Sequence, residues 1–246
     1  MTFEVVQIGD ATLIFGDNLA YMRAEKPRID ALIADIPYKM KTSGGGEFRK
    51  SRTYLDEIKA NGTADGFDIE VFHYAMRLGC NSLVTFYSLD QEPSILRFFH
   101  QGLFDKQKPL YFEHQQPIPW QKTNPTPFCN RAYNADVEYI RHGWRAPFKL
   151  KQRPLKDMKT WWSNGNGKSE FDHPSVKPIL LMRKLVRNAS HRGQLVIDPC
   201  MGTGSTGVAC IQLGRKFIGI EHNRAYFDIA VERLQAAYAE MSGVVA

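Results

Sequence analysis

The chain has little of what marks membrane, secreted or metal-binding proteins. No run of the sequence reaches the roughly 18 apolar residues that a membrane-spanning helix needs, and the first residues lack the basic-then-apolar pattern of a secretory signal. The four cysteines form no CxxC pair, which argues against a disulfide scaffold. The seven histidines are dispersed, so we expect no catalytic metal. Together these absences favour a protein of the reducing cytoplasm.

Acidic residues are the minority charge, and the formal net charge is +6. Between residues 141 and 159, seven Lys and Arg residues stand against one acid, and tryptophans flank or interrupt this run. Such a balance is compatible with nucleic acid, although many basic proteins bind none. A length of 246 residues fits one large domain. We therefore expect a single domain over 1–246, with a short basic segment at about 142–172 as the candidate nucleic-acid contact.

Strand and helix patterns alternate along the chain, which predicts an α/β fold with a mostly parallel sheet covered on both faces. A hairpin is expected over residues 3–15, turned at 9–10. Further strands are expected at 30–35, 82–87, 108–114, 135–141, 194–198 and 216–220, and helices at 69–78, 94–101, 175–189, from 204, and at 223–240.

A glycine-rich loop near the C-terminal end is the most informative motif. Residues 202–207 read GTGSTG after an apolar strand, and Glu221 closes the next strand at the spacing of a ribose-binding acid. A nicotinamide dinucleotide would match these letters, but too little chain follows to build its second half. Asp198, at the strand tip, would repel a pyrophosphate and suits a ligand with an ammonium group. S-adenosylmethionine carries such a group and a ribose diol without phosphate, so we expect it as cofactor; for the loop alone, a ligand-free tight turn is the alternative.

Four motifs in this order and spacing resemble the permuted (beta) group of DNA amino-methyltransferases, whose target-base half precedes the cofactor half. These are DIPY at 35–38, similar to DPPY; HPSVKP at 173–178, similar to HPTxKP; DPCMGTGSTG at 198–207, similar to DPFxGSGTT; and RKFIGIE at 215–221. The resemblance implies a Rossmann-like S-adenosylmethionine-dependent methyltransferase sheet with permuted motif order. Ile36 replaces the first proline of DPPY and Cys200 replaces the usual phenylalanine. These departures keep open a DNA-binding homologue without turnover.

The DIPY segment is the expected catalytic centre. An exocyclic amine of a base is a poor nucleophile, because its lone pair is delocalised into the ring. The carboxylate of Asp35 and the backbone carbonyl of Ile36 are expected to grip its two N–H bonds, while Pro37 shapes the turn. Tyr38 is expected to stack on a base swung out of the duplex. The resemblance implies that an acid at position 35 favours adenine N6, since serine there more often marks cytosine N4 enzymes. Cytosine N4 is the runner-up, and an adenine in RNA is a further alternative.

The resemblance and the chemistry also assign residues to the cofactor. Asp198 is expected to meet the methionine moiety, Glu221 the ribose hydroxyls and Asp17 the adenine amine, although an acid after glycine is common in turns. Backbone approach to the ligand is expected to need glycine at 202 and 204. Lys177 and Ser175 are expected to reach the methionine carboxylate from the start of their helix. The predicted cofactor-binding residues are Asp17, Pro174, Ser175, Lys177, Asp198, Pro199, Gly202, Gly204, Ser205, Thr206 and Glu221.

The expected partner is double-stranded DNA. Phosphate contacts need Lys and Arg, and aromatic residues can stack on bases. The predicted DNA-binding residues are Arg49, Lys50, Arg52, Arg145, Lys149, Lys151 and Arg153; a solvated charged face is the alternative for this stretch. The resemblance also suggests a homodimer, and the sequence does not identify a restriction partner.

Overall fold

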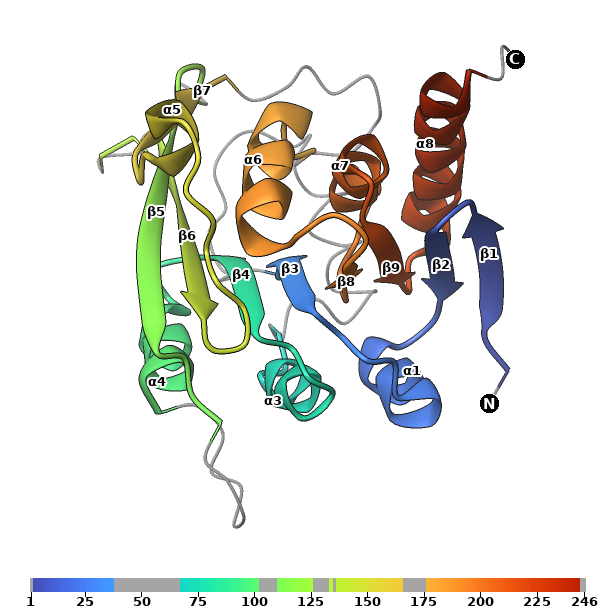
Figure 1. Cartoon of the computed structure of the whole chain (residues 1–246), viewed down its shortest axis with the longest axis horizontal. Helices are drawn as coiled ribbons and strands as arrows, with labels where there is room; N and C mark the ends of the chain where they lie inside the picture. The colour runs from blue at the N-terminus through green and yellow to red at the C-terminus, as the bar shows by residue number, and fades with distance from the viewer. Residues whose placement is uncertain are drawn as a thin grey trace, which may run out of the picture.

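The structure is a computed structural model that describes residues 2–37, 67–101, 110–125, 133–134, 136–165 and 176–243. Within these ranges the strands form one nine-stranded sheet in the order β1-β2-β9-β8-β3-β4-β6-β5-β7 (Figure 1). The strands are β1 Glu4–Ile8, β2 Ala11–Phe15, β3 Ala31–Asp35, β4 Ser82–Tyr87, β5 His114–Lys122, β6 Val137–Trp144, β7 Trp162–Asn164, β8 Leu195–Asp198 and β9 Lys216–Glu221. The helices are α1 Asn18–Glu25, α3 Glu70–Arg77, α4 Glu92–Gln101, α5 Leu155–Met158, α6 Ile179–Ala189, α7 Ser205–Leu213 and α8 Arg224–Ser242.

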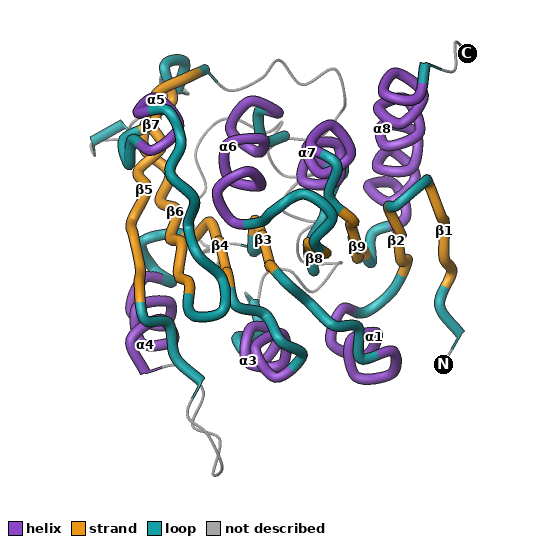
Figure 2. Tube along the Cα trace, viewed as in Figure 1, coloured by secondary structure: helices purple, strands orange, loops and turns teal. Residues whose placement is uncertain are grey.

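The centre of the sheet is parallel. β2, β9, β8, β3 and β4 run in one direction, with β8 between β9 and β3. Antiparallel strands extend the sheet at both ends, β1 beside β2 and the β6–β5 pair beside β4 (Figure 2). The expected α/β class is confirmed, with a mixed sheet around a parallel centre. The carboxyl ends of β3, β8 and β9 therefore meet at one edge, where ligands bind in open α/β sheets.

Helices cover both faces of the sheet: α6, α7 and α8 lie on one face and α1, α3 and α4 on the other (Figure 1). Each layer forms its own apolar core, represented by Leu185 and Leu234 on the first face and by Phe72 and Phe99 on the second. In α3, the buried residues Val71, Phe72, Ala75 and Met76 follow the spacing of one helical face. No helix among the described residues is long and apolar enough to cross a bilayer.

Two prolines explain why β5 differs from the strand expected at 108–114. Residues 108 and 109 lie outside the described ranges, and the strand begins only at His114. Pro117 and Pro119 lack the N–H that a central strand needs, and their presence hid the strand from pattern reading. In the sheet, β7 pairs with β5 only from Trp120 onward, so both prolines occupy a stretch where β5 is an edge strand.

The helix expected at 175–189 begins later, at Ile179, with Pro178 at its N-cap. Proline disfavours helical backbone in the residue before it, because its ring collides with that residue. Lys177 therefore precedes α6 and does not lie in its first turn. This shift changes the contacts of the Lys177 side chain.

Candidate active site

Three carboxylates end three neighbouring parallel strands. Asp35 is the last residue of β3, Asp198 of β8 and Glu221 of β9, and these strands are adjacent in the sheet. Parallel strands present their carboxyl ends at the same edge, so the motifs that the sequence separates by more than half its length come together here. The convergence of Asp35 with the glycine loop follows directly from this topology.

Asp198 is a buried carboxylate with raised pKa. It accepts hydrogen bonds from Thr206 Oγ1 at 2.5 Å and from the Cys200 amide at 3.1 Å, and is 2% exposed. Burial raises the pKa of Asp198 to about 7; these two donors oppose the shift, and the carboxylates of Asp35 and Glu221 add to it. The free protein thus holds an acid near its midpoint of ionisation at neutral pH. Its contact with the methionine moiety stays a prediction.

Glu221 ties the glycine loop to β9. Its Oε2 accepts from the Gly202 amide at 2.9 Å, and its Oε1 accepts from the amides of His222 and Asn223 at 2.9 and 2.8 Å. Burial raises the pKa of Glu221, and these amide donors limit the rise. The geometry fixes the carboxylate beside the loop, while its contact with a ribose remains an expectation.

Both predicted loop glycines adopt left-handed backbone, with φ of 51° at Gly202 and 81° at Gly204. A Cβ on Gly204 would lie 2.6 Å from Leu234 Cδ1 and 3.1 Å from Ala230 Cβ, both in α8. At Gly204 the atoms that exclude a side chain therefore belong to the protein's own core. Packing against α8 therefore requires glycine at 204, and the close approach of its backbone to a ligand stays a prediction.

Arg233 supports the same loop, and sequence reasoning missed it. Its Nη1 donates to the Thr203 carbonyl at 2.5 Å, to Thr203 Oγ1 at 2.9 Å and to Ser205 Oγ at 3.3 Å. An arginine within the terminal helix α8 belongs to no recognisable motif, so the sequence carried no signal for this role. Ser205 and Thr206 begin α7 and are buried, consistent with loop support.

The segment after β2 contacts the same sheet edge. The side chain of Asp17 caps α1 by accepting from the Ala20 amide at 2.7 Å, which is the turn role weighed as its alternative. Asn18 Nδ2 donates to the Pro199 carbonyl at 3.0 Å, and the Gly16 amide donates to the backbone carbonyl of Glu221, the last residue of β9, at 3.0 Å. Contact of Asp17 with the cofactor's adenine stays a prediction.

The turn after Asp35 is held by a glutamine. Ile36 is 3% exposed and belongs to the apolar core on the α1, α3 and α4 face. The Pro37 carbonyl accepts from Gln91 Nε2 at 2.7 Å, while Gln91 Oε1 accepts from the amide and hydroxyl of Ser88 at 3.0 and 3.2 Å. Gln91 thus fixes the turn to the end of β4. Tyr38 lies outside the described residues, as do Pro174 and Ser175.

Lys177 lies beside Asp35, where the sequence did not place it. Its Nζ is 2.6 Å from Asp35 Oδ2 and 3.3 Å from Glu138 Oε2. Glu138 Oε1 in turn meets Lys122 Nζ at 2.6 Å. Lys177 precedes the N-cap of α6 instead of lying in its first turn, and its contact with the methionine carboxylate stays a prediction.

Among the predicted DNA-contacting residues, Arg145 lies at the opposite edge of the sheet. Arg49, Lys50 and Arg52 lie outside the described residues. Arg145 follows β6, which runs antiparallel to β4 and ends at the sheet edge opposite Asp35. Its guanidinium donates to the Asn81 side chain at 3.1 Å and to the carbonyls of Met76 and Cys80 at 3.4 and 3.3 Å. These contacts give Arg145 a structural role.

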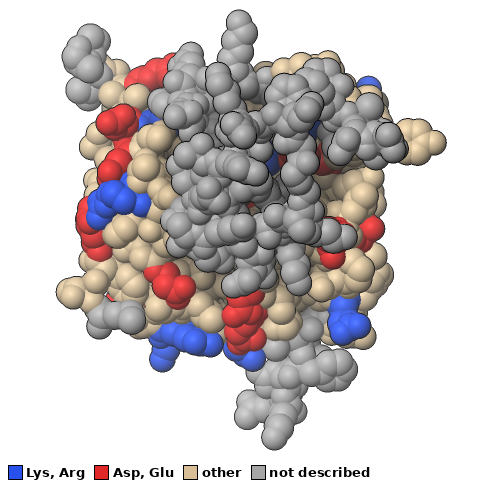
Figure 3. All heavy atoms as spheres, turned by 180° about the vertical axis from the view of Figure 1, so that it is seen from behind, with Lys and Arg blue, Asp and Glu red and all other residues tan. Residues whose placement is uncertain are grey.

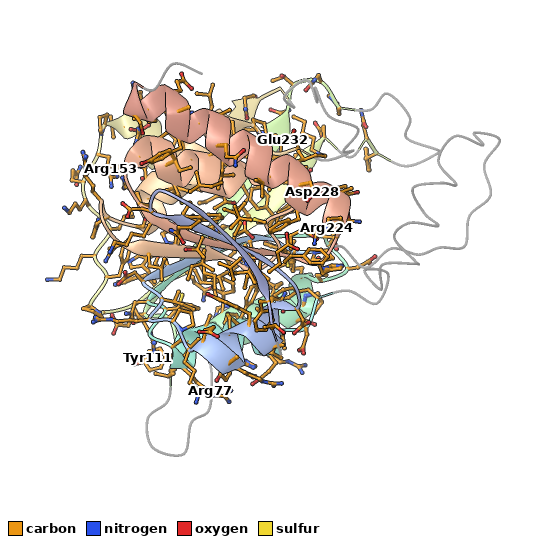
Figure 4. All side chains as sticks on the ribbon, turned by 90° about the vertical axis from the view of Figure 1, so that its right-hand side faces the viewer. Arg77, Tyr111, Arg153, Arg224, Asp228 and Glu232 are labelled. Atoms are coloured by element: carbon orange, nitrogen blue, oxygen red, sulfur yellow. The ribbon has the colours of Figure 1, made fainter. Side chains whose placement is uncertain are left out.

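Arg153 is likewise engaged, donating to the Arg187 carbonyl at 2.6 Å. It lies on the opposite side of the molecule from Arg224, which begins α8 directly after β9 (Figure 4). Lys149 and Lys151 are exposed, whereas Arg145 and Arg153 are half-buried. Figure 3 shows the face turned away from the viewer in Figure 1. Acidic and basic side chains of the described residues are interspersed around the periphery of that face. DNA contact by this segment stays a prediction.

The described residues contain neither a candidate metal site nor an activated thiol. No group of three or more His, Cys, Asp or Glu residues there could hold a metal ion. Burial raises the pKa of the Cys80 thiol to about 12 and that of the Cys200 thiol well above its ordinary value, with Asp198 and Glu221 adding to the shift at Cys200. Neither thiol is activated as a nucleophile.

Comparison with known proteins agrees with this geometry. Residues 29–232 match the DNA methylase family. The Type II methyltransferase M2.DpnII of Streptococcus pneumoniae is 27% identical, over 91% of this chain and 89% of its own, and M2.LlaDCHI of Lactococcus lactis subsp. cremoris is 28% identical, over 95% and 93%. The crystal structure of an M1.HpyAVI–SAM complex shares the fold with a TM-score of 0.67 at 23% identity, over 91% of this chain and 98% of that one. The chain belongs to the DNA methylase family.

Proposed function

We propose that this DNA methylase transfers the methyl group of S-adenosylmethionine to the exocyclic N6 amine of adenine in double-stranded DNA. The observation that carries the proposal is the meeting of Asp35, Asp198 and Glu221 at the carboxyl ends of adjacent strands β3, β8 and β9. The glycine loop follows Asp198, in the middle of this row, and Glu221 at one end accepts a hydrogen bond from it; the predicted base-binding turn follows Asp35 at the other end. A cofactor and a base bound at these two places would be neighbours.

The charges at this edge fit the proposed cofactor. Burial together with the neighbouring carboxylates raises the pKa of Asp198 to about 7, so the site favours a ligand that brings positive charge. S-adenosylmethionine carries a sulfonium and an ammonium, and its sulfonium methyl is already activated for transfer. Asp198 would meet the ammonium, and Glu221 would accept from the ribose hydroxyls. A pyrophosphate-bearing dinucleotide would instead face three carboxylates, which disfavours that alternative.

Asp35 is the residue that would act on the base. It is 29% exposed at its side chain, and Lys177 holds its Oδ2. An ionised carboxylate accepts an N–H of the exocyclic amine, draws the nitrogen toward tetrahedral geometry and stabilises the positive charge that develops there. It then receives the proton that the methylated amine loses. Because the methyl group is already activated, the remaining requirement is alignment of the amine with it, which the clamped turn at Pro37 supports.

Adenine is proposed because an acid, rather than serine, opens the tetrapeptide. The same grip would fit the N4 amine of cytosine, which remains the alternative base. Carbon-5 methylation of cytosine is not proposed, because among the described residues the raised pKa values of the Cys80 and Cys200 thiols make them poor nucleophiles.

The test is to incubate the protein with methyl-labelled S-adenosylmethionine and unmodified genomic DNA, then digest the DNA to nucleosides and identify the labelled one. We expect label in N6-methyldeoxyadenosine. Label in N4-methyldeoxycytidine would keep the mechanism and overturn the choice of base. Absence of label with measurable cofactor binding would overturn DNA methyl transfer; a parallel incubation with RNA then tests the other polymer.

A further inference from the structure

A chain of alternating charges leads from Asp35 across the sheet edge. Lys177 Nζ lies 2.6 Å from Asp35 Oδ2 and 3.3 Å from Glu138 Oε2, and Lys122 Nζ lies 2.6 Å from Glu138 Oε1. Asp35 ends β3, Glu138 lies in β6, and Lys122 ends β5, so the chain crosses strands that are neighbours or next neighbours in the sheet. Each carboxylate in it contacts at least one ammonium group, and Lys177 lies between two carboxylates.

Burying the ammonium group of Lys177 removes it from water, which costs free energy that nearby carboxylates must offset. Its side chain is 5% exposed, and its Nζ lies 5.0 Å from the centre of the Phe86 ring. Burial alone would lower the pKa of Lys177, but the carboxylates of Asp35 and Glu138 raise it overall. The pKa of Glu138 is lowered: burial opposes this shift, and Lys177 and Lys122 outweigh it. Both groups are therefore held in their charged forms.

Asp35 needs such a cation because other acids gather at the same edge. Asp198 and Glu221 end the neighbouring strands, and like charges favour protonation of one member of a group. A protonated Asp35 would offer a donor where the exocyclic amine needs an acceptor. An ammonium group at 2.6 Å favours the anion and fixes the plane of the carboxylate.

We propose that Lys177, itself held by Glu138 and Lys122, is a positioning residue for methyl transfer: its ammonium orients the Asp35 carboxylate and keeps it an anionic acceptor for the exocyclic amine. This inference rests on the proposed function. It differs from the role that the sequence suggested, in which Lys177 binds the carboxylate of the cofactor. The two roles predict different losses when the charge is removed.

Single-turnover transfer from labelled S-adenosylmethionine to DNA separates the chemical step from binding. Lys177→Met should lower the single-turnover rate about 100-fold and change the dissociation constants for cofactor and DNA by less than about threefold. The rise of the rate with pH should move upward by at least about one pH unit, since a carboxylate that loses an adjacent cation ionises at higher pH. Among the described residues, Lys177 contacts Asp35 directly, Asp198 and Cys200 interact with it electrostatically, and Glu138 contacts Lys177 from β6.

Lys184→Met is the matched control. Lys184 is 4% exposed, but its Nζ donates to the Lys159 carbonyl at 2.6 Å, away from the acids of the site. This variant should keep the wild-type rate and pH profile. A Lys177→Met enzyme with unchanged rate and pH profile would overturn the proposal. A loss confined to cofactor affinity would also overturn it and would make Lys177 a ligand of the cofactor.

A double-mutant cycle tests the pair without turnover. Lys177→Met and Asp35→Asn, made singly and together, should be non-additive by at least about tenfold in the unfolding equilibrium constant; additive effects contradict the pairing. If the wild type transferred no methyl group, the proposed function would fail while this cycle still tested the pair. If Lys177→Met does not fold, Glu138→Gln replaces it, with an expected fall of about tenfold in single-turnover rate; an unchanged rate would overturn the proposal.

Discussion

Asp198→Asn should make the protein more stable at neutral and alkaline pH and weaken its binding of cofactor. The carboxyl group of Asp198 is 2% exposed, and burial raises its pKa from its ordinary 3.8 to about 7. Asparagine has the same shape without the charge. Its amide can keep both local contacts, since the Thr206 hydroxyl can rotate to accept a hydrogen bond and the Cys200 amide can still donate to Oδ1.

The expected gain follows from the pKa of Asp198. A rise of about 3 units, at about 1.4 kcal/mol per unit, means that ionising this group costs about 4 kcal/mol more in the folded protein than in the unfolded chain. The unfolded chain loses this proton near pH 4 and the folded protein near pH 7, so rising pH destabilises the wild type across that window. Between about pH 5 and about pH 8, the wild type should lose roughly 3 kcal/mol relative to Asp198→Asn.

Urea unfolding at several pH values measures this difference, because subtracting the two proteins cancels the other titrating groups. Asp10→Asn controls for removal of a carboxylate from an exposed position. Cofactor affinity of Asp198→Asn should fall about 10- to 100-fold, since the ammonium loses a charged hydrogen-bond partner. A difference in unfolding free energy between the two proteins that does not change with pH would show that folding does not raise the pKa of Asp198. Unchanged cofactor affinity would refute its role in binding.

Four other variants test the turn, the glycine loop and the basic segment. Gln91→Leu frees the Pro37 carbonyl from its 2.7 Å hydrogen bond and should lower the single-turnover rate about tenfold without changing cofactor affinity; an unchanged rate would show that the turn needs no clamp. Gly204→Ala should lower the free energy of unfolding by about 2 kcal/mol or more, measured by urea unfolding, because its Cβ would lie 2.6 Å from a core atom and φ is 81°. Replacing Lys149 and Lys151 together with Ala should flatten the salt dependence of DNA binding by up to about two units of slope, whereas Arg145→Ala should chiefly reduce stability; an unchanged slope removes the lysines from the DNA surface.

The sequence predicted the elements whose signals are local. β4 is a run of apolar and β-branched residues bounded by turns, and its expected range, 82–87, agrees with the structure. The hairpin at 3–15 is confirmed as β1 and β2, and the glycine loop lies between β8 and α7 as expected. In the structure, Asp35 and Asp198 lie at one sheet edge because they end β3 and β8, which are parallel neighbours. The permuted order of the two halves stays a prediction.

The remaining features depend on contacts between distant segments. Nothing near Lys177 in the sequence reveals Glu138 as its partner, and the start expected for α6 overlooked the effect of Pro178 on the preceding residue. The hydrogen bonds of Arg145 to Asn81 and Cys80 did not follow from the sequence, because charge counts do not show which guanidinium groups are used inside the protein. Pattern reading supplies the strand ends, whereas the partners of each buried charge emerge only from packing.

We propose that the Asp35 carboxylate holds the exocyclic amine in position for methyl transfer from the cofactor. Its most direct test compares wild type and Asp35→Asn in a single turnover with labelled S-adenosylmethionine and DNA, with cofactor affinity measured in parallel. We predict label in N6-methyldeoxyadenosine for the wild type and a loss of at least about 1,000-fold in rate for the variant, with cofactor affinity kept within about threefold. A variant that transfers methyl groups at a rate near that of the wild type would show that Asp35 does not act on the amine.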